Sequence, residues 1–152
     1  MPYPNLFDAA TAEAAVQRIL ALTPETQPEW GKMSVSQMLA HVNVAYEMAY
    51  GDKHSRPNAI MRAILKLFVK AAVVGPTPYK KNVPTAPSFR ITDAREFEAE
   101  RDRLIAFIRR TAELNAAHFG GKESLSFGAL TAGEWNTLFS KHLDHHLTQF
   151  GV

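Results

Sequence analysis

The chain of 152 residues contains no cysteine. This absence excludes disulfide bonds, thiolate metal ligands and a cysteine nucleophile, so any metal must be bound through nitrogen and oxygen atoms. No run of about 18 apolar residues occurs, which predicts that the chain does not span a membrane. The N-terminus lacks a basic start followed by an apolar run and a cleavage site, so we predict no signal peptide and a cytoplasmic location.

An excess of charge of one sign is also missing. The chain carries 17 basic and 15 acidic residues, for a net charge of +2. It has no dense lysine and arginine cluster with interleaved aromatic residues, so nucleic acid is not an expected partner. The length predicts one domain over residues 1–152, with a core of its own.

Strand signals are scarce, because alternating runs of Val, Ile and Thr and an Asn-Gly turn do not occur. Apolar residues instead recur at helical spacing, which predicts an all-α protein. We expect long helices that begin near Asp8 or Thr11, at Ser34, at Thr92 or Asp93, and at Thr131. The first ends near residue 22, the second near Gly51, the third near Asn115 and the fourth at Phe150. A further helical segment is expected over residues 57–74.

Two capping boxes support these boundaries, and the connections predict the topology. Ser34 with Gln37, and Thr131 with Glu134, place a capping side chain and its partner three residues apart. Asp93 with Glu96 has the same spacing. Residues 52–91 form a connection long enough to cross the length of a helix, so we expect a four-helix bundle whose second and third long helices run parallel.

The last helix contains two histidines within its apolar arc. His142 and His146 are four residues apart, so their imidazoles project from successive turns toward the same side. Buried imidazole nitrogens need hydrogen-bond partners or a metal, so the presence of two histidines on one apolar face needs an explanation. Gln149 faces the same side one turn further on and could bond a histidine or a ligand. His145 falls at the edge of the arc and is not assigned as a ligand.

A third histidine lies on the apolar side of the second helix. His41 is surrounded there by Met38, Val42, Ala45 and Met48. One histidine from this helix and a spaced pair from the last helix would form a three-ligand site for a divalent metal, with a position left open. The alternative is that these histidines are structural and bond to neighbouring backbone or side chains.

Essentially the whole chain resembles a known protein family. The resemblance is clearest in three segments, QPEWGKMSVSQMLAH, KKNVPTAP and KHLDHHLTQFGV. The sequence resembles the DinB/YfiT-like superfamily of metalloenzymes, and more narrowly a branch of it without an assigned activity. The resemblance implies a four-helix bundle in up-down-down-up order with a divalent metal held by His41, His142 and His146. It also implies a small-molecule substrate, since some members are transferases and isomerases that use low-molecular-weight thiols.

Three imidazole ligands suit zinc, nickel or iron better than magnesium or calcium, which prefer oxygen. The open position would bind water or a substrate thiol and lower its pKa. We therefore expect a metal-dependent enzyme, a thiol transferase or a hydrolase. No catalytic residue beyond the ligands can be assigned from the sequence.

The segment over residues 57–74 supports a different function. It places basic side chains opposite apolar ones, a pattern typical of a helix that lies on an anionic membrane or in a partner's groove. The alternative to the enzyme is therefore a non-catalytic binding or membrane-surface module. The same pattern also fits a helix that covers the bundle and whose basic side chains are solvated. The sequence does not determine the oligomeric state, and a homodimer is among the states it allows. The basic residues are Arg62, Lys66 and Lys70, and the apolar ones are Ile60, Ile64, Leu67, Phe68 and Val74.

Overall fold

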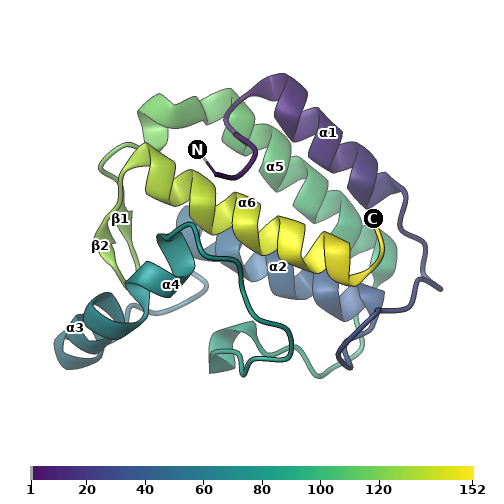
Figure 1. Ribbon diagram of the computed structural model, residues 1–152, viewed down its shortest axis with the longest axis horizontal. Coiled ribbons are helices and arrows are strands. Elements are labelled where there is room, and N and C mark those ends of the chain that lie inside the picture. The colour runs from purple at the N-terminus through teal and green to yellow at the C-terminus, as the bar shows by residue number, and fades with distance from the viewer. Residues whose placement is uncertain (1) are drawn as a thin grey trace.

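A computed structural model describes residues 2–152 and shows a mostly helical protein (Figure 1). The prediction of an all-α fold is confirmed, apart from a hairpin of two-residue strands. The long helices are α1 (Ala9–Leu20), α2 (Val35–Tyr50), α5 (Phe97–Phe119) and α6 (Ala132–Gln149). The connection between α2 and α5 holds α3 (Ala59–Phe68), α4 (Lys70–Val74) and the 3-10 turn η1 (Pro87–Phe89). The hairpin strands are β1 (Glu123–Ser124) and β2 (Gly128–Ala129).

The four long helices lie side by side around a common core (Figure 1). Helix α2 packs against α5 and α6, α1 packs against α5, and α4 packs against α6. Stacked aromatic rings join three of these helices, because Tyr46 of α2 lies 4.5 Å from Phe139 of α6 and 5.5 Å from Phe107 of α5 between ring centroids. The four-helix bundle topology and its up-down-down-up order stay predictions.

Three predicted helix starts are confirmed by their caps. The side chain of Asp8 accepts a hydrogen bond from the Thr11 amide at the start of α1. Ser34 with Gln37 and Thr131 with Glu134 both form complete capping boxes, with each side chain bonded to the other residue's amide. These bonds satisfy amide groups that have no partner within the helix.

The predicted start of α5 at Thr92 or Asp93 is wrong. Helix α5 begins at Phe97, after Glu96. The Asp93 carboxylate lies 3.1 Å from the Arg95 guanidinium, and its backbone carbonyl accepts a bond from the Gln37 side chain. Asp93 therefore joins the connection to the start of α2 and does not cap a helix.

Two other predicted boundaries also differ. Asn115, the expected end of the helix, adopts a left-handed φ of 55°, but helical structure resumes after it and continues to Phe119. The Asn115 side-chain oxygen accepts a hydrogen bond from the Ala117 amide at 3.0 Å, as an N-cap residue does at the start of a helix. The single segment expected over residues 57–74 is divided at Val69, which ends α3 and precedes α4. The division lets α4 pack against α6, while α3 projects away from the long helices (Figure 1).

A buried polar network joins α2 to α5. The Glu47 carboxylate lies 3.2 Å from the guanidinium of Arg103 on α5, and Arg103 also contacts Glu100 at 2.9 Å. The Asn43 amide donates to the Glu100 carboxylate at 2.9 Å. Because buried charges are stable only when they are paired and hydrogen-bonded, these contacts fix the position of α2 on α5.

No helix within residues 2–152 is both long and apolar enough to cross a membrane.

Candidate metal site

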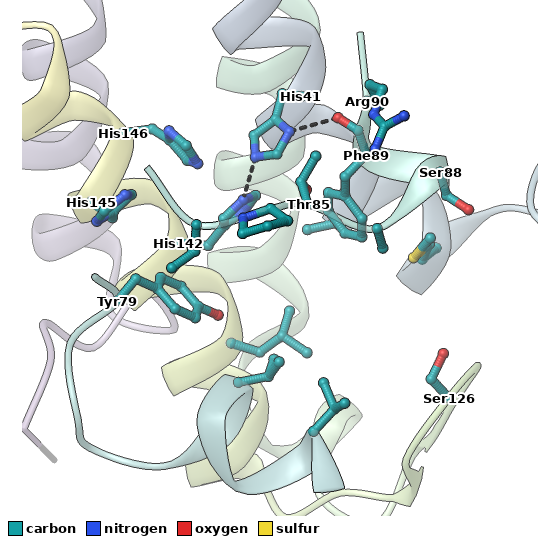
Figure 2. A pocket seen from close by; sticks show the side chains of 18 of the residues that line it. His41, Tyr79, Thr85, Ser88, Phe89, Arg90, Ser126, His142, His145 and His146 are labelled. Atoms are coloured by element: carbon teal, nitrogen blue, oxygen red, sulfur yellow. Dashed lines mark hydrogen bonds between the residues drawn. The ribbon is translucent and has the colours of Figure 1, made fainter. Parts of the chain in front are cut away.

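Helices α2 and α6 bring three histidines together inside the bundle (Figure 2). His41 comes from α2, and His142 and His146 come from successive turns of α6. One ring nitrogen of each lies within 4.8 Å of the others. His41 and His146 are buried and His142 is partly buried. The predicted convergence of the three imidazoles is therefore present in the structure, and their binding of a metal stays a prediction.

The orientation of His41 is set by the crossover connection. Its Nδ1 lies 2.7 Å from the backbone carbonyl oxygen of Phe89, in η1. A carbonyl can only accept a hydrogen bond, so Nδ1 carries the proton and donates it. The lone pair of His41 is consequently on Nε2, which faces the other two histidines (Figure 2). This tautomer is the one that a metal ligand bonding through Nε2 requires.

His146 is oriented in a similar way by Gln149. Its Nδ1 lies 2.7 Å from the Gln149 side-chain oxygen, and the Gln149 amide nitrogen donates to the Trp30 carbonyl at 2.8 Å. The second bond identifies which end of the Gln149 amide is the oxygen, so His146 Nδ1 must be the donor. A Cβ on Gly31 would lie 2.7 Å from the Gln149 nitrogen, and the φ of Gly31 is +83°. Only glycine fits this position without strain.

His142 completes the cluster through its own Nε2. This atom lies 2.9 Å from Nε2 of His41, which is a hydrogen-bond distance (Figure 2). A tetrahedral metal with bonds of 2.0–2.1 Å would hold its nitrogen ligands about 3.3 Å apart. The two rings would therefore have to separate by only a fraction of an ångström to admit an ion. All the ligand nitrogens lie within 4.8 Å of one another, so the most distant pair would have to approach by about 1.5 Å. The donor set fits a divalent metal.

The electrostatics of the cluster favour neutral imidazoles. Burial lowers the pKa of His41, and burial together with the neighbouring histidines lowers the pKa of His142 well below its usual value. Burial lowers the pKa of His146 to about 3. A metal binds only the unprotonated ring, so at neutral pH no proton has to be displaced from a charged imidazolium.

Comparison with family models identifies the family of this chain. A family model described as the DinB superfamily matches residues 9–150, which include all three histidines. The chain belongs to the DinB superfamily. The resemblance seen in the sequence is thereby confirmed. No curated protein and no solved structure matches the chain.

In this DinB-superfamily member the histidines open onto a cavity of about 610 Å³. Volumes of 300–1,000 Å³ are typical of sites for small molecules. Trp30, Tyr79 and Phe89 contribute aromatic walls near the histidines, and Tyr79 and Phe89 come from the crossover connection. His145 also lines the cavity, with its ring 5.0 Å from that of His146, but it does not belong to the three-nitrogen cluster. It stays unassigned as a ligand.

Sequence reasoning missed several residues that build this site. The Phe89 and Trp30 carbonyls act through the backbone, which leaves no signal in residue identity. Tyr79 lies in a proline-rich connection where no periodicity indicates a buried face. Lys141 follows Ser140 on α6 and is only 1% exposed. No signal in the sequence indicates this burial, because a lysine on a helix is almost always exposed.

Proposed function

We propose that this protein is a metal-dependent enzyme that uses the three histidines to bind a divalent ion and activate a low-molecular-weight thiol. The observation that supports the proposal is the set of three ring nitrogens within 4.8 Å, with two of the rings held in the ligating tautomer by Phe89 and Gln149. Zinc, nickel and iron are the ions that suit an all-imidazole set. A bound divalent ion lowers the pKa of a thiol or a water molecule that coordinates it.

The cavity favours a transferase over a hydrolase. No Asp or Glu side chain from residues 2–152 lines it. In metalloproteases of the His-Glu-x-x-His type, a glutamate beside the metal is the general base that activates water, and among the described residues this cavity offers no such carboxylate. A thiolate is itself a strong nucleophile, so a thiol transferase needs only to lose the thiol proton.

In the proposed reaction the thiol proton passes to His145 or to solvent. The sulfur then forms a bond to an electrophilic carbon of the second substrate, and the leaving group departs with the electron pair. Burial lowers the pKa of His145, which therefore has a free ring nitrogen at neutral pH. Burial raises the pKa of Tyr79 to about 12, so its hydroxyl stays protonated and serves as a hydrogen-bond donor.

The experiment is a thiol-transfer assay on metal-loaded protein purified without a polyhistidine tag. A panel of low-molecular-weight thiols would be mixed with 1-chloro-2,4-dinitrobenzene or with its carboxylate-bearing analogue 4-chloro-3,5-dinitrobenzoate, and the thioether product followed by its absorbance. We expect a metal-dependent rate above the uncatalysed background with at least one thiol, lost on chelation and restored by adding the ion back. A background rate with every thiol, in protein that binds metal stoichiometrically, would contradict the proposal.

One observation supports the alternative of a binding or membrane-surface module. The apolar face of α3 is exposed, with Ile60, Leu67 and Phe68 at 73–76%. However, Lys70 of the basic stripe is paired with Glu134 at 3.2 Å and is not free to contact a membrane. Co-sedimentation with anionic vesicles that depends on Arg62 and Lys66, in protein without a metal, would favour this alternative.

Replacing Gln149 by leucine is expected to weaken metal binding about 10–100-fold, the effect typical of losing a group that orients a metal ligand. The variant removes the acceptor of the His146 Nδ1 proton, so the ring is free to rotate and to change tautomer. Competition with a chromophoric chelator would measure the affinity. The matched control is Gln17→Leu, on an exposed position of α1, which should bind metal like the original protein. Equal affinities of the two variants would show that Gln149 does not support the site.

A further inference from the structure

The cavity next to the histidines has an uneven distribution of charge. Its lining contains three cationic side chains, those of Lys32, Lys80 and Arg90, and no carboxylate from the described residues 2–152. None of the three cations forms an ion pair with any described side chain. A cavity that gathers unpaired charge of one sign raises the local concentration of ligands with the opposite sign.

The cations lie at the end of the cavity that holds the histidines. Arg90 follows Phe89, whose carbonyl oxygen is bonded to the His41 ring, and Figure 2 shows Arg90 on the far side of that carbonyl. Lys80 follows Tyr79, whose ring contacts His142 and His145.

Lys32 reaches the same end from the other side of the site. It follows Gly31, which lies against the Gln149 side chain that orients His146. The histidine end of the cavity is thus lined by three exposed cationic residues, one from the segment before α2 and two from the crossover connection.

The opposite end of the cavity is apolar. Leu138 lies one turn before His142 on α6, and Trp135 lies almost one turn before that. At 1.5 Å per residue, Trp135 is about 16 Å along the helix from His146. Most of the other walls of this end are apolar and come from α3, α4 and the hairpin, through Leu65, Val73, Leu125 and Phe127. The hairpin also contributes Ser124 and Ser126.

We infer that the electrophilic substrate is an amphipathic carboxylic acid, with its carboxylate among Lys32, Lys80 and Arg90 and its apolar body extending toward Trp135. The length and volume of the cavity accommodate a medium-length aliphatic chain or one aromatic ring with a side chain. The apolar walls offer too few polar groups for a sugar or a nucleotide, and the three cations disfavour a cationic ligand. The inference rests on the proposed function in that it assigns the second substrate of the same site.

Binding of unreactive probes to metal-free protein tests this inference separately from catalysis. The probes are decanoate, decan-1-ol and decyltrimethylammonium, which share an alkyl chain and differ in charge. Both tryptophans of the chain line the cavity, so their fluorescence reports on its occupancy. We expect decanoate to bind at least about tenfold more tightly than decanol, because contacts between its carboxylate and the cationic residues add to the apolar contacts that both ligands make. Decyltrimethylammonium should bind most weakly, because its positive charge is repelled by the same residues.

Two variants locate the two ends of the ligand. One is a triple variant that removes the three positive charges and should abolish the preference for decanoate while leaving the affinity for decanol unchanged. It carries Lys32→Gln, Lys80→Gln and Arg90→Gln. Leu125→Glu, which places a carboxylate at the apolar end, should weaken both ligands. The matched control, Arg56→Gln/Lys66→Gln/Lys122→Gln, removes equal charge outside the cavity and should keep the preference.

The inference is overturned if the three probes bind alike, if none binds, or if both triple variants lose the preference equally. Its failure is distinguishable from failure of the proposed function. Protein that shows metal-dependent thiol transfer but no carboxylate preference refutes only the substrate class. Protein that prefers decanoate but shows no thiol transfer refutes only the reaction.

Discussion

Replacing His142 by alanine is expected to abolish stoichiometric binding of a divalent metal. The variant removes one of three imidazole nitrogens that lie within 4.8 Å of one another. Loss of a ligand should cost more than the roughly 10–100-fold that follows loss of a group that only orients one. Titration with cobalt(II), whose visible absorption reports tetrahedral coordination, would measure the effect, supported by metal analysis of protein purified without a polyhistidine tag.

The same helix offers a matched control for this variant. His145 lines the cavity beside His146 but lies outside the cluster, so His145→Ala should keep the metal. His41→Ala tests the same site from α2 and should lose the metal as His142→Ala does. Stoichiometric cobalt binding by folded His142→Ala or His41→Ala would refute the three-histidine site. If His145→Ala loses the metal to the same extent, His145 also contributes to metal binding and the site is not limited to the three histidines.

Replacing Lys141 by methionine is expected to lower the free energy of unfolding by about 3 kcal/mol. The Lys141 ammonium donates to the carbonyl oxygens of Ala72 and Gly75 at 2.7 Å and of Thr77 at 3.1 Å. Methionine fills a similar volume but leaves these three acceptors without the donor. For a domain of this size the loss corresponds to a fall in Tm of about 10 °C. Urea unfolding followed by circular dichroism would measure it.

The bonds of Lys141 also connect the crossover to α6. They hold the C-terminal end of α4 and the segment leading to Tyr79, whose ring lies 4.6 Å from the Lys141 ammonium. The matched control is Lys66→Met on the exposed side of α3, which should change stability by less than about 0.5 kcal/mol. If Lys141→Met is as stable as this control, the three bonds do not hold the crossover.

Spacing was sufficient to predict the part of the site that lies within one helix. His142 and His146 are four residues apart, and an α-helix directs such a pair to one side whatever the surrounding fold. The capping boxes at Ser34 and Thr131 were predictable for the same reason, since their partners lie three residues away in the chain. His41 was predictable from the apolar residues around it on α2, because apolar helix faces turn toward the core.

Contacts between distant segments could not be predicted in this way. Nothing in the sequence near Lys141 indicates that three carbonyls from a segment more than 60 residues earlier would surround its ammonium. The helix predicted at Asp93 failed for a related reason, because the Asp93 backbone carbonyl accepts a hydrogen bond from the side chain of Gln37 in α2. In both places a tertiary contact outweighed the local signal.

The amino-acid sequence by itself determined that the chain is helical, where three of its long helices begin, and which histidines face the core. These properties depend on side chains within a few residues of one another. Only the tertiary structure decided that the rings from α2 and α6 meet at one point, that Phe89 selects the tautomer of His41 and Trp30 orients Gln149, and that the cavity is cationic at one end and mostly apolar at the other. Those features depend on distances between segments far apart in the chain, which are set by how the helices pack and which local patterns do not encode.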